Sequence, residues 1–173
     1  NAIYLNVGGK TFGKPVAYGT GKDNTRSVVL ADMNGDGHLD IIAANVGQPN
    51  RVFFNDGKGG FSKSTEFGGE QNPSYSVAIA DMDQDGDKDI VIGNVGQQNV
   101  IYFNEAKGTK YRSLSFGGAT SATYCVALGD LNGDKYPDIV IGNSGTHNFV
   151  YLNQGKKGKA GNLSPPQQLA LKQ

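Results

Sequence analysis

The sequence predicts an all-β chain made of β-propeller blades, and three observations support this fold class. The 173 residues repeat with a period of 49, which lies in the range of propeller blades. Short runs of valine, isoleucine and aromatic residues alternate with turns of glycine, asparagine and aspartate, a pattern typical of strands joined by tight turns. No segment shows sustained helical periodicity.

The repeat can be followed through single residues. Asp32, Asp81 and Asp130 open three acidic windows, each 49 residues after the last. Two sets of asparagines keep the same step, one beginning at Asn1 and the other at Asn6. The register holds to about residue 153, which predicts repeats at 1–49, 50–98 and 99–147, a partial repeat at 148–153, and a basic, proline-containing tail or linker at 154–173.

Each repeat is expected to contain four short strands. The first precedes the acidic window and the second follows it; both are apolar at nearly every position, which suits inner strands packed between neighbouring blades. The fourth strand is the least regular. In order of their place in the repeat, the expected strands are 27–31, 76–80 and 125–129; 41–44, 90–93 and 139–142; 3–5, 52–54, 100–103 and 149–152; and 12–17, 61–67 and 111–116.

The single cysteine stands in the third copy of the first strand. Cys125 takes the place of Ser27 and Ser76 in the other repeats and has no second cysteine to pair with. A reactive thiol needs an electropositive environment, and the sequence around it shows none. We therefore expect a small, buried residue of an inner strand.

Carboxylates are concentrated in the three acidic windows at 32–40, 81–89 and 130–138, which hold eleven of the sixteen acidic residues. Such clusters repel one another unless a cation lies among them. Oxygen-bearing side chains occur at window positions 1, 3, 5 and 9, and position 7 offers its backbone carbonyl, which matches the oxygen ligands of calcium. The predicted ligands of up to three Ca²⁺ ions are Asp32, Asn34, Asp36, His38 and Asp40; Asp81, Asp83, Asp85, Asp87 and Asp89; and Asp130, Asn132, Asp134, Tyr136 and Asp138, with His38, Asp87 and Tyr136 acting through their carbonyls.

The residue at position 6 predicts how strongly each loop binds calcium relative to the others. Gly37 and Gly86 permit a sharp turn, whereas the third loop has Lys135 there. We expect the third site to be the weakest, and the middle one, with five carboxylates, to be the strongest. An EF-hand is excluded because position 12 lies in an expected strand instead of carrying a glutamate. Magnesium remains the second choice of ion, and simple Asp/Gly turns without a metal are the structural alternative.

The chain resembles the FG-GAP/VCBS repeat family. Phe67, Gly68 and Gly69 precede one inner strand, and the same three residues recur 49 positions later, whereas Tyr18, Gly19 and Thr20 depart from the phrase in the first copy. The resemblance covers about residues 1–153. It implies blades like those of integrin α-subunit heads, kinship with secreted bacterial proteins and some fungal lectins, and calcium at the loop aspartates. It does not imply a partner, because partners vary widely in this family.

Three repeats are too few for an ordinary closed propeller, which has at least four blades. The chain begins in a third strand and leaves the repeat after a third strand, so we expect a segment of a larger propeller. Self-association of two copies to close the ring and solvated, frayed ends are the alternatives.

No catalytic constellation is evident. The two histidines, His38 and His147, belong to no triad or zinc-ligand spacing, and no phosphate-binding glycine loop occurs. We therefore expect a non-enzymatic, calcium-stabilised module for protein binding or adhesion. A lectin that uses the repeated asparagines, such as Asn45 and Asn50, and a structural subunit of a larger complex are the alternatives. The partner is expected to be a protein or glycan, without nucleic acid or membrane insertion, in an extracellular or periplasmic setting.

Overall fold

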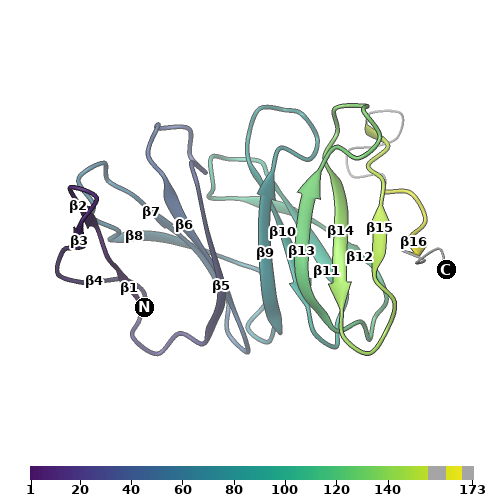
Figure 1. Ribbon diagram of the computed structural model, residues 1–173, viewed down its shortest axis with the longest axis horizontal. Coiled ribbons are helices and arrows are strands. Elements are labelled where there is room, and N and C mark those ends of the chain that lie inside the picture. Colours follow the sequence, from purple (N-terminus) through teal and green to yellow (C-terminus); the bar gives the residue numbers. More distant parts are fainter. Residues whose placement is uncertain (156–162, 169–173) are drawn as a thin grey trace.

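The computed structural model describes residues 1–155 and 163–168. Within these residues three four-stranded antiparallel sheets follow one another along the chain, with strand orders β5-β6-β7-β8, β9-β10-β11-β12 and β13-β14-β15-β16. Figure 1 shows them in chain order along the long axis, with β5, β9 and β13 side by side. No helix of these residues has the length and apolar character of a membrane span. The predicted fold class, propeller blades of four strands, is confirmed.

Each sheet is an up-and-down meander and forms one blade. The first blade consists of β5 (Thr25–Ala31), β6 (Asp40–Asn45), β7 (Asn50–Phe54) and β8 (Lys63–Phe67). The second consists of β9 (Ser74–Ala80), β10 (Asp89–Asn94), β11 (Asn99–Asn104) and β12 (Tyr111–Phe116). The third consists of β13 (Thr123–Gly129), β14 (Asp138–Asn143), β15 (Phe149–Tyr151) and β16 (Gln167–Gln168).

The first strand of every blade begins two residues before its expected start. The register of the β5–β6 pair shifts between Thr25 and Ser27, and that of the third blade shifts between Thr123 and Cys125. Such a β-bulge adds one unpaired residue without ending the strand. The strand therefore continues through a position at which the apolar pattern stops.

The fourth strand of the third blade comes from the tail. β16 pairs with β15, with Phe149 opposite Gln168 and Val150 opposite Gln167. Ser164 extends the contact by donating its backbone N–H to the Leu152 carbonyl at 2.8 Å. This part of the tail thus lies in the blade sheet, whereas the basic run at 156–159 lies outside the described residues.

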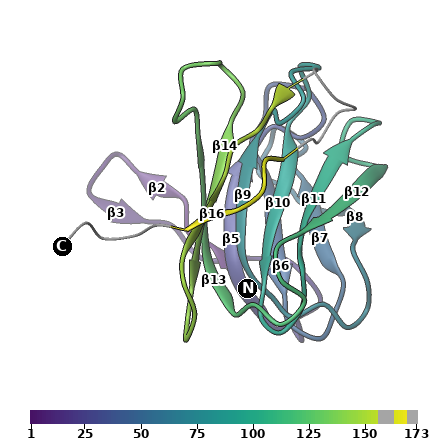
Figure 2. The same ribbon diagram turned by 90° about the vertical axis from the view of Figure 1, so that its right-hand side faces the viewer.

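The N-terminal residues form two short two-stranded sheets. The expected strand at 12–17 is divided, because β1 (Ala2–Ile3) pairs with β4 (Val16–Ala17) and β2 (Asn6–Val7) pairs with β3 (Thr11–Phe12). The β2–β3 hairpin stands away from the three blades (Figure 2). Ile3 and Tyr18 cover Phe53 of the first blade, and the Tyr18 and Phe53 rings meet edge-to-face at 5.3 Å.

The apolar core lies between successive blades. One cluster joins Met33 and Ile42 of the first blade to Val77 and Ile90 of the second. A second cluster joins the second and third blades in the same way. Every residue of β6 and of β10 is buried, which agrees with the expectation that the second strands are packed between neighbours.

Cys125 is exposed, so the expectation of burial is wrong. Its counterpart Ser76 is buried because the next blade covers it, and the Ser76 hydroxyl accepts the Val126 backbone N–H at 3.0 Å. No described blade follows the third one, and Cys125 therefore lacks the corresponding cover.

Candidate metal centres

The three acidic loops share one backbone geometry, which begins with the aspartate at position 1. In the first loop Asp32 accepts the N–H groups of Gly35 and Gly37 at 2.7 and 2.8 Å. In the third loop Asp130 accepts those of Gly133 and Lys135 at 2.7 and 2.9 Å. The aspartate therefore folds the loop around its own carboxylate, as an Asx-type turn does.

The aspartate at position 9 begins the second strand of the blade and is fully buried in all three copies. In the middle loop Asp89 accepts two backbone hydrogen bonds, from Met82 at 2.7 Å and from Asn104 at 2.8 Å. The pKa of Asp89 is nevertheless raised to about 7, mainly by burial and to a smaller extent by the nearby carboxylates of Asp83 and Asp85, against the lowering effect of the two N–H donors. Burial also raises the pKa of Asp40, the equivalent residue of the first loop.

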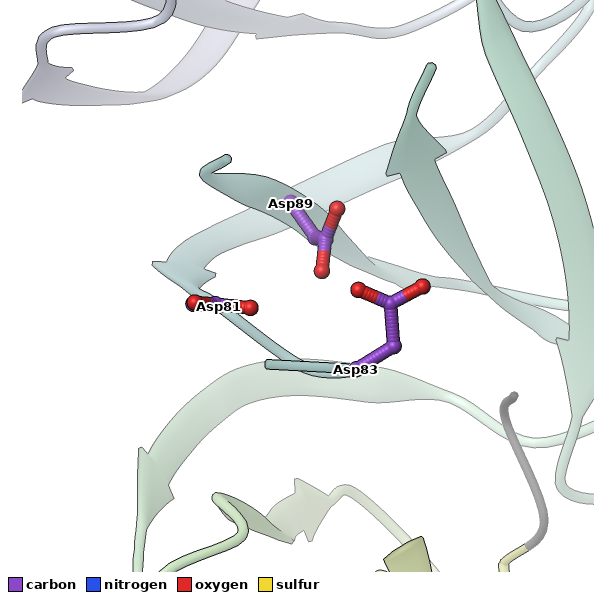
Figure 3. A group of neighbouring side chains, drawn as sticks. All are labelled: Asp81, Asp83 and Asp89. Carbon is purple, nitrogen blue, oxygen red and sulfur yellow. The ribbon is translucent and has the colours of Figure 1, made fainter. Parts of the chain in front are cut away.

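The middle loop brings three carboxylates together. Asp81, Asp83 and Asp89 each offer one oxygen, and these oxygens lie within 4.8 Å of one another; Figure 3 shows the three side chains around a common space. The pKa of Asp83 is raised by burial and then by the charges of Asp85 and Asp81. Its Oδ1 atom is buried and has no hydrogen-bond partner among the described residues.

This donor set fits a hard divalent cation. Buried carboxylate oxygens are costly when they lack a partner, and calcium accepts six to eight oxygens at about 2.3–2.6 Å. A cation among the three carboxylates would offset their mutual repulsion and would give the Asp83 Oδ1 atom a partner. The residues present in the middle loop therefore fit the ion that the sequence predicts.

The first and third loops differ from the middle one at position 3. Asn34 donates its side-chain N–H to Asp36 at 2.8 Å, and Asn132 donates to Asp134 at 3.1 Å. These loops place one charge fewer at that position, and the amide satisfies the neighbouring carboxylate. At position 7 the backbone N–H groups of His38, Asp87 and Tyr136 each donate to the position-5 aspartate at 2.9 Å.

Backbone conformation refines the ranking of the loops. Gly37 and Gly86 have φ values of +86° and +100°, and Lys135 adopts +75°, as the position-6 argument expects. Position 4 is also left-handed, with Gly35 at +75° and Gln84 at +57°. Residues other than glycine are strained in this conformation. The middle loop therefore has the most carboxylates but also one strained residue, and the first loop has glycine at both turns.

Arg112 lies beside the middle loop and was not predicted as part of the site. Its guanidinium is 4.0 Å from the centre of the Phe103 ring, and its Nη2 atom is 3.8 Å from Asp83 Oδ2. This positive charge lowers the pKa of Asp83 in part. The one indication in the sequence is that a basic residue, Lys63, occupies the same place in the first repeat, 49 residues before Arg112.

The repeated turn asparagines are engaged within the fold. The Asn50 Oδ1 atom accepts the Asn45 backbone N–H at 2.8 Å, and the Asn45 side chain donates to the Pro49 carbonyl at 2.8 Å. The Asn50 side chain donates to Ser74 of the next blade at 3.1 Å. In the first repeat these amides therefore join blades and cap turns.

Repeated four-stranded blades, each with an acidic loop between its two inner strands, define a protein of the β-propeller type. The sequence matches the FG-GAP-like repeat at 1–43, 32–92 and 81–141, and the FG-GAP repeat at 124–161. The chain belongs to the FG-GAP repeat family. Repeats of this family form propeller-type modules that are often used for protein binding or adhesion, often bind calcium, and are typically non-catalytic. No curated protein matches the chain.

Proposed function

We propose that this protein is a calcium-stabilised, non-catalytic recognition module that binds a protein partner outside the cytoplasm. The observation that supports calcium best is the middle loop, where Asp81, Asp83 and Asp89 converge and one buried oxygen lacks a partner. Bound calcium would neutralise these carboxylates and cross-link the turn. The side-chain oxygens at positions 1, 3, 5 and 9 would hold it in each loop, with the carbonyls of His38, Asp87 and Tyr136.

The role of the ion is structural in this proposal. The loops join the two inner strands of each blade, and the position-9 aspartate is buried at the start of the second strand. Metal that binds only the folded loops stabilises the folded state by linkage. Each loop with its ion therefore stabilises the turn between the two inner strands of its blade.

Calcium titration and thermal unfolding test this part of the proposal. We expect calcium to raise the melting temperature and a chelator to lower it, and we expect magnesium to be a weaker substitute. Asp81→Asn should reduce the calcium-dependent increase, whereas Glu70→Gln, an exposed acidic position outside the loops, should leave it unchanged. A melting temperature that changes with neither calcium nor chelator would contradict calcium binding.

Calcium affinity also bears on localisation. Sites with dissociation constants of about 0.1–1 mM are filled only at the calcium level found outside cells, whereas cytosolic sites need far tighter binding. The proposed extracellular or periplasmic setting predicts the weaker range. Isothermal titration measures it, and dissociation constants near 10⁻⁷ M or below would remove this reason for a secreted protein.

A protein partner is favoured over a glycan because the asparagine amides of the first two repeats already serve internal hydrogen bonds. Propellers also present loops from every blade on one face, which suits a broad contact. Parallel glycan and protein arrays discriminate the two partners: the proposal expects protein binding that persists and no signal on glycans. Reproducible binding to one class of glycan would replace it with the lectin.

The end faces of the blade series suggest further blades as a second kind of partner. Val28 and Leu30 of β5 are 47% and 56% exposed, whereas their repeat counterpart Val77 is covered by the preceding blade. Such apolar faces are costly in water. Remaining blades of a longer chain or a second copy would cover them.

A further inference from the structure

A buried asparagine at the end of β11 joins two acidic loops of different blades. The Asn104 backbone N–H donates to Asp89 Oδ1 of its own blade at 2.8 Å. Its side-chain N–H donates to the Met33 carbonyl, in the loop of the preceding blade, at 3.0 Å. Asn104 therefore touches the closing aspartate of one loop and the position-2 carbonyl of another.

The next blade repeats this arrangement. The Asn153 backbone N–H donates to Asp138 Oδ1 at 2.8 Å, and its side-chain N–H donates to the Met82 carbonyl at 2.8 Å. Asn104 and Asn153 are both buried. Buried hydrogen bonds of this kind are costly to break, because the groups left behind lack partners.

The position-2 residues connect these links to each other. Met33 donates its backbone N–H to Asp40 Oδ2 at 2.9 Å, and Met82 donates to Asp89 Oδ2 at 2.7 Å. A continuous, mainly buried series of hydrogen bonds therefore passes through all three loops. Its members, in order, are Asp138, Asn153, Met82, Asp89, Asn104, Met33 and Asp40.

The middle and third loops share one additional contact at the surface. The Gln84 side chain donates to the Lys135 carbonyl at 2.7 Å. Gln84 sits at position 4 of its loop and Lys135 at position 6 of the next. This contact adds a second link between neighbouring loops at a residue that supplies no predicted ligand.

We propose that Asn104 and Asn153 couple the metal loops, so that calcium bound in one blade favours calcium binding in the neighbouring blade. The inference rests on the calcium binding proposed above. An ion that orders one loop fixes its position-2 carbonyl and its position-9 carboxylate, which are the partners of the neighbouring asparagines. The next ion then binds a loop that is already partly ordered, and this gives positive cooperativity.

The first blade supplies a matched control. Asn55 has the same repeat position, and its backbone N–H donates to Asp40 Oδ1 at 2.9 Å. Its side chain donates at 3.1 Å to Leu39 of its own loop, with no link to another blade. Asn55 also accepts the Gly57 N–H, as Asn104 accepts that of Gly108. Asn55→Ala thus removes a similar turn bond without breaking an inter-loop link.

A calcium titration of the full chain followed by amide NMR reports on each loop separately. The N–H groups of Gly37, Gly86 and Lys135 donate to the position-1 aspartates of the first, middle and third loops. We expect the three curves to rise together, with a Hill coefficient above one. In Asn104→Ala the Gly37 curve should move to calcium concentrations about two- to tenfold higher, the range that one hydrogen bond supports, although Asn104 belongs to another blade.

The other two curves should stay together in Asn104→Ala, and Asn55→Ala should leave all three coincident. Gln84→Gly is a second variant that removes one of the two links between the middle and third loops at an exposed, left-handed position, and it should separate the Lys135 curve from that of Gly86 only in part, because Asn153 still joins these loops. This variant remains informative if Asn104→Ala fails to fold.

The outcomes distinguish this inference from the proposal on which it rests. If no amide of the unaltered chain responds to calcium, calcium binding itself is wrong, and the coupling with it. If the amides respond but the Gly37 curve is the same in Asn104→Ala and the unaltered chain, calcium binding stands and the coupling is wrong. Equal shifts in Asn104→Ala and Asn55→Ala would also overturn the coupling.

Discussion

At the scale of single residues, the left-handed backbone positions of the loops favour glycine, and any other residue there lowers stability. Lys135 adopts φ +75° where the other loops have glycine, and an L-residue there costs roughly 1–2 kcal/mol. Lys135→Gly should therefore raise the free energy of unfolding by about 0.5–1 kcal/mol, after the entropy that glycine gains in the unfolded chain is subtracted. Urea unfolding measures this. Gly37→Lys is the reciprocal control and should destabilise; an unchanged or lowered midpoint for Lys135→Gly would contradict the strain.

A second prediction concerns the direction in which one substitution changes stability, which should differ without and with calcium. Asp83 has a buried oxygen without a partner, and the charges of Asp81 and Asp85 lie close to it. Without calcium, Asp83→Asn should stabilise the fold by about 1 kcal/mol, because it removes this repulsion and introduces the amide seen at Asn34. With calcium the same change should lower the melting temperature, because a charged ligand is lost.

Asn34→Asp in the first loop is the matched control for this reversal. It should lower stability in chelator and increase the stabilisation by calcium. Thermal unfolding of both variants, with and without calcium, tests the pair. If Asp83→Asn changes stability in the same direction under both conditions, its carboxylate is not a metal ligand.

Much of the candidate site could be predicted from the sequence because its determinants are local. The oxygen-bearing residues of a loop and its glycine at position 6 lie within nine residues of each other. Gly35 and Gly133 indicate a left-handed conformation at position 4 of the first and third loops, whereas Gln84 at the same position of the middle loop does not. The role of Asn104 could not be predicted, because its partner is a backbone carbonyl 71 residues away and carbonyls leave no trace in a sequence.

At the scale of the elements, the apolar strands could be predicted and the strand of the tail could not. β6 and β10 are continuous apolar runs bounded by Asp and Asn, and they lie where the sequence placed them. β16 consists of Gln167–Gln168, which are exposed and carry no apolar pattern. The pairing of β16 with β15 depends on backbone hydrogen bonds, which any residue except proline provides.

Burial at one repeat position depends on whether a blade follows. Met82 is 1% exposed beneath the third blade, whereas its counterpart Leu131 is 58% exposed. Met82→Ala should therefore cost about 2–5 kcal/mol. Leu131→Ala, a similar loss of side-chain volume, should cost no more than about 0.5 kcal/mol. Chemical denaturation compares the two, and equal losses would mean that the contact with the next blade contributes little.

At the scale of the whole molecule, the two end faces complement each other. The inner strand of the first blade presents Val28 and Leu30, the positions that Val77 and Ile79 use against a preceding blade. The third blade presents Leu131, the position that Met33 and Met82 use against a following blade. A repeated interface that is buried twice within the chain is therefore available once more at its ends.

If these end faces bring copies together, a single charge should prevent it. We expect the unaltered chain to associate with rising concentration in sedimentation equilibrium, because apolar burial stabilises contacts roughly in proportion to the area removed from water. Leu30→Lys should remain monomeric with little change in melting temperature, since Leu30 is exposed in the single chain. Val7→Lys, at an equally exposed apolar residue of the β2–β3 hairpin, should associate like the unaltered chain. A monomer at all concentrations, or identical association of both variants, would show that the end faces do not join copies.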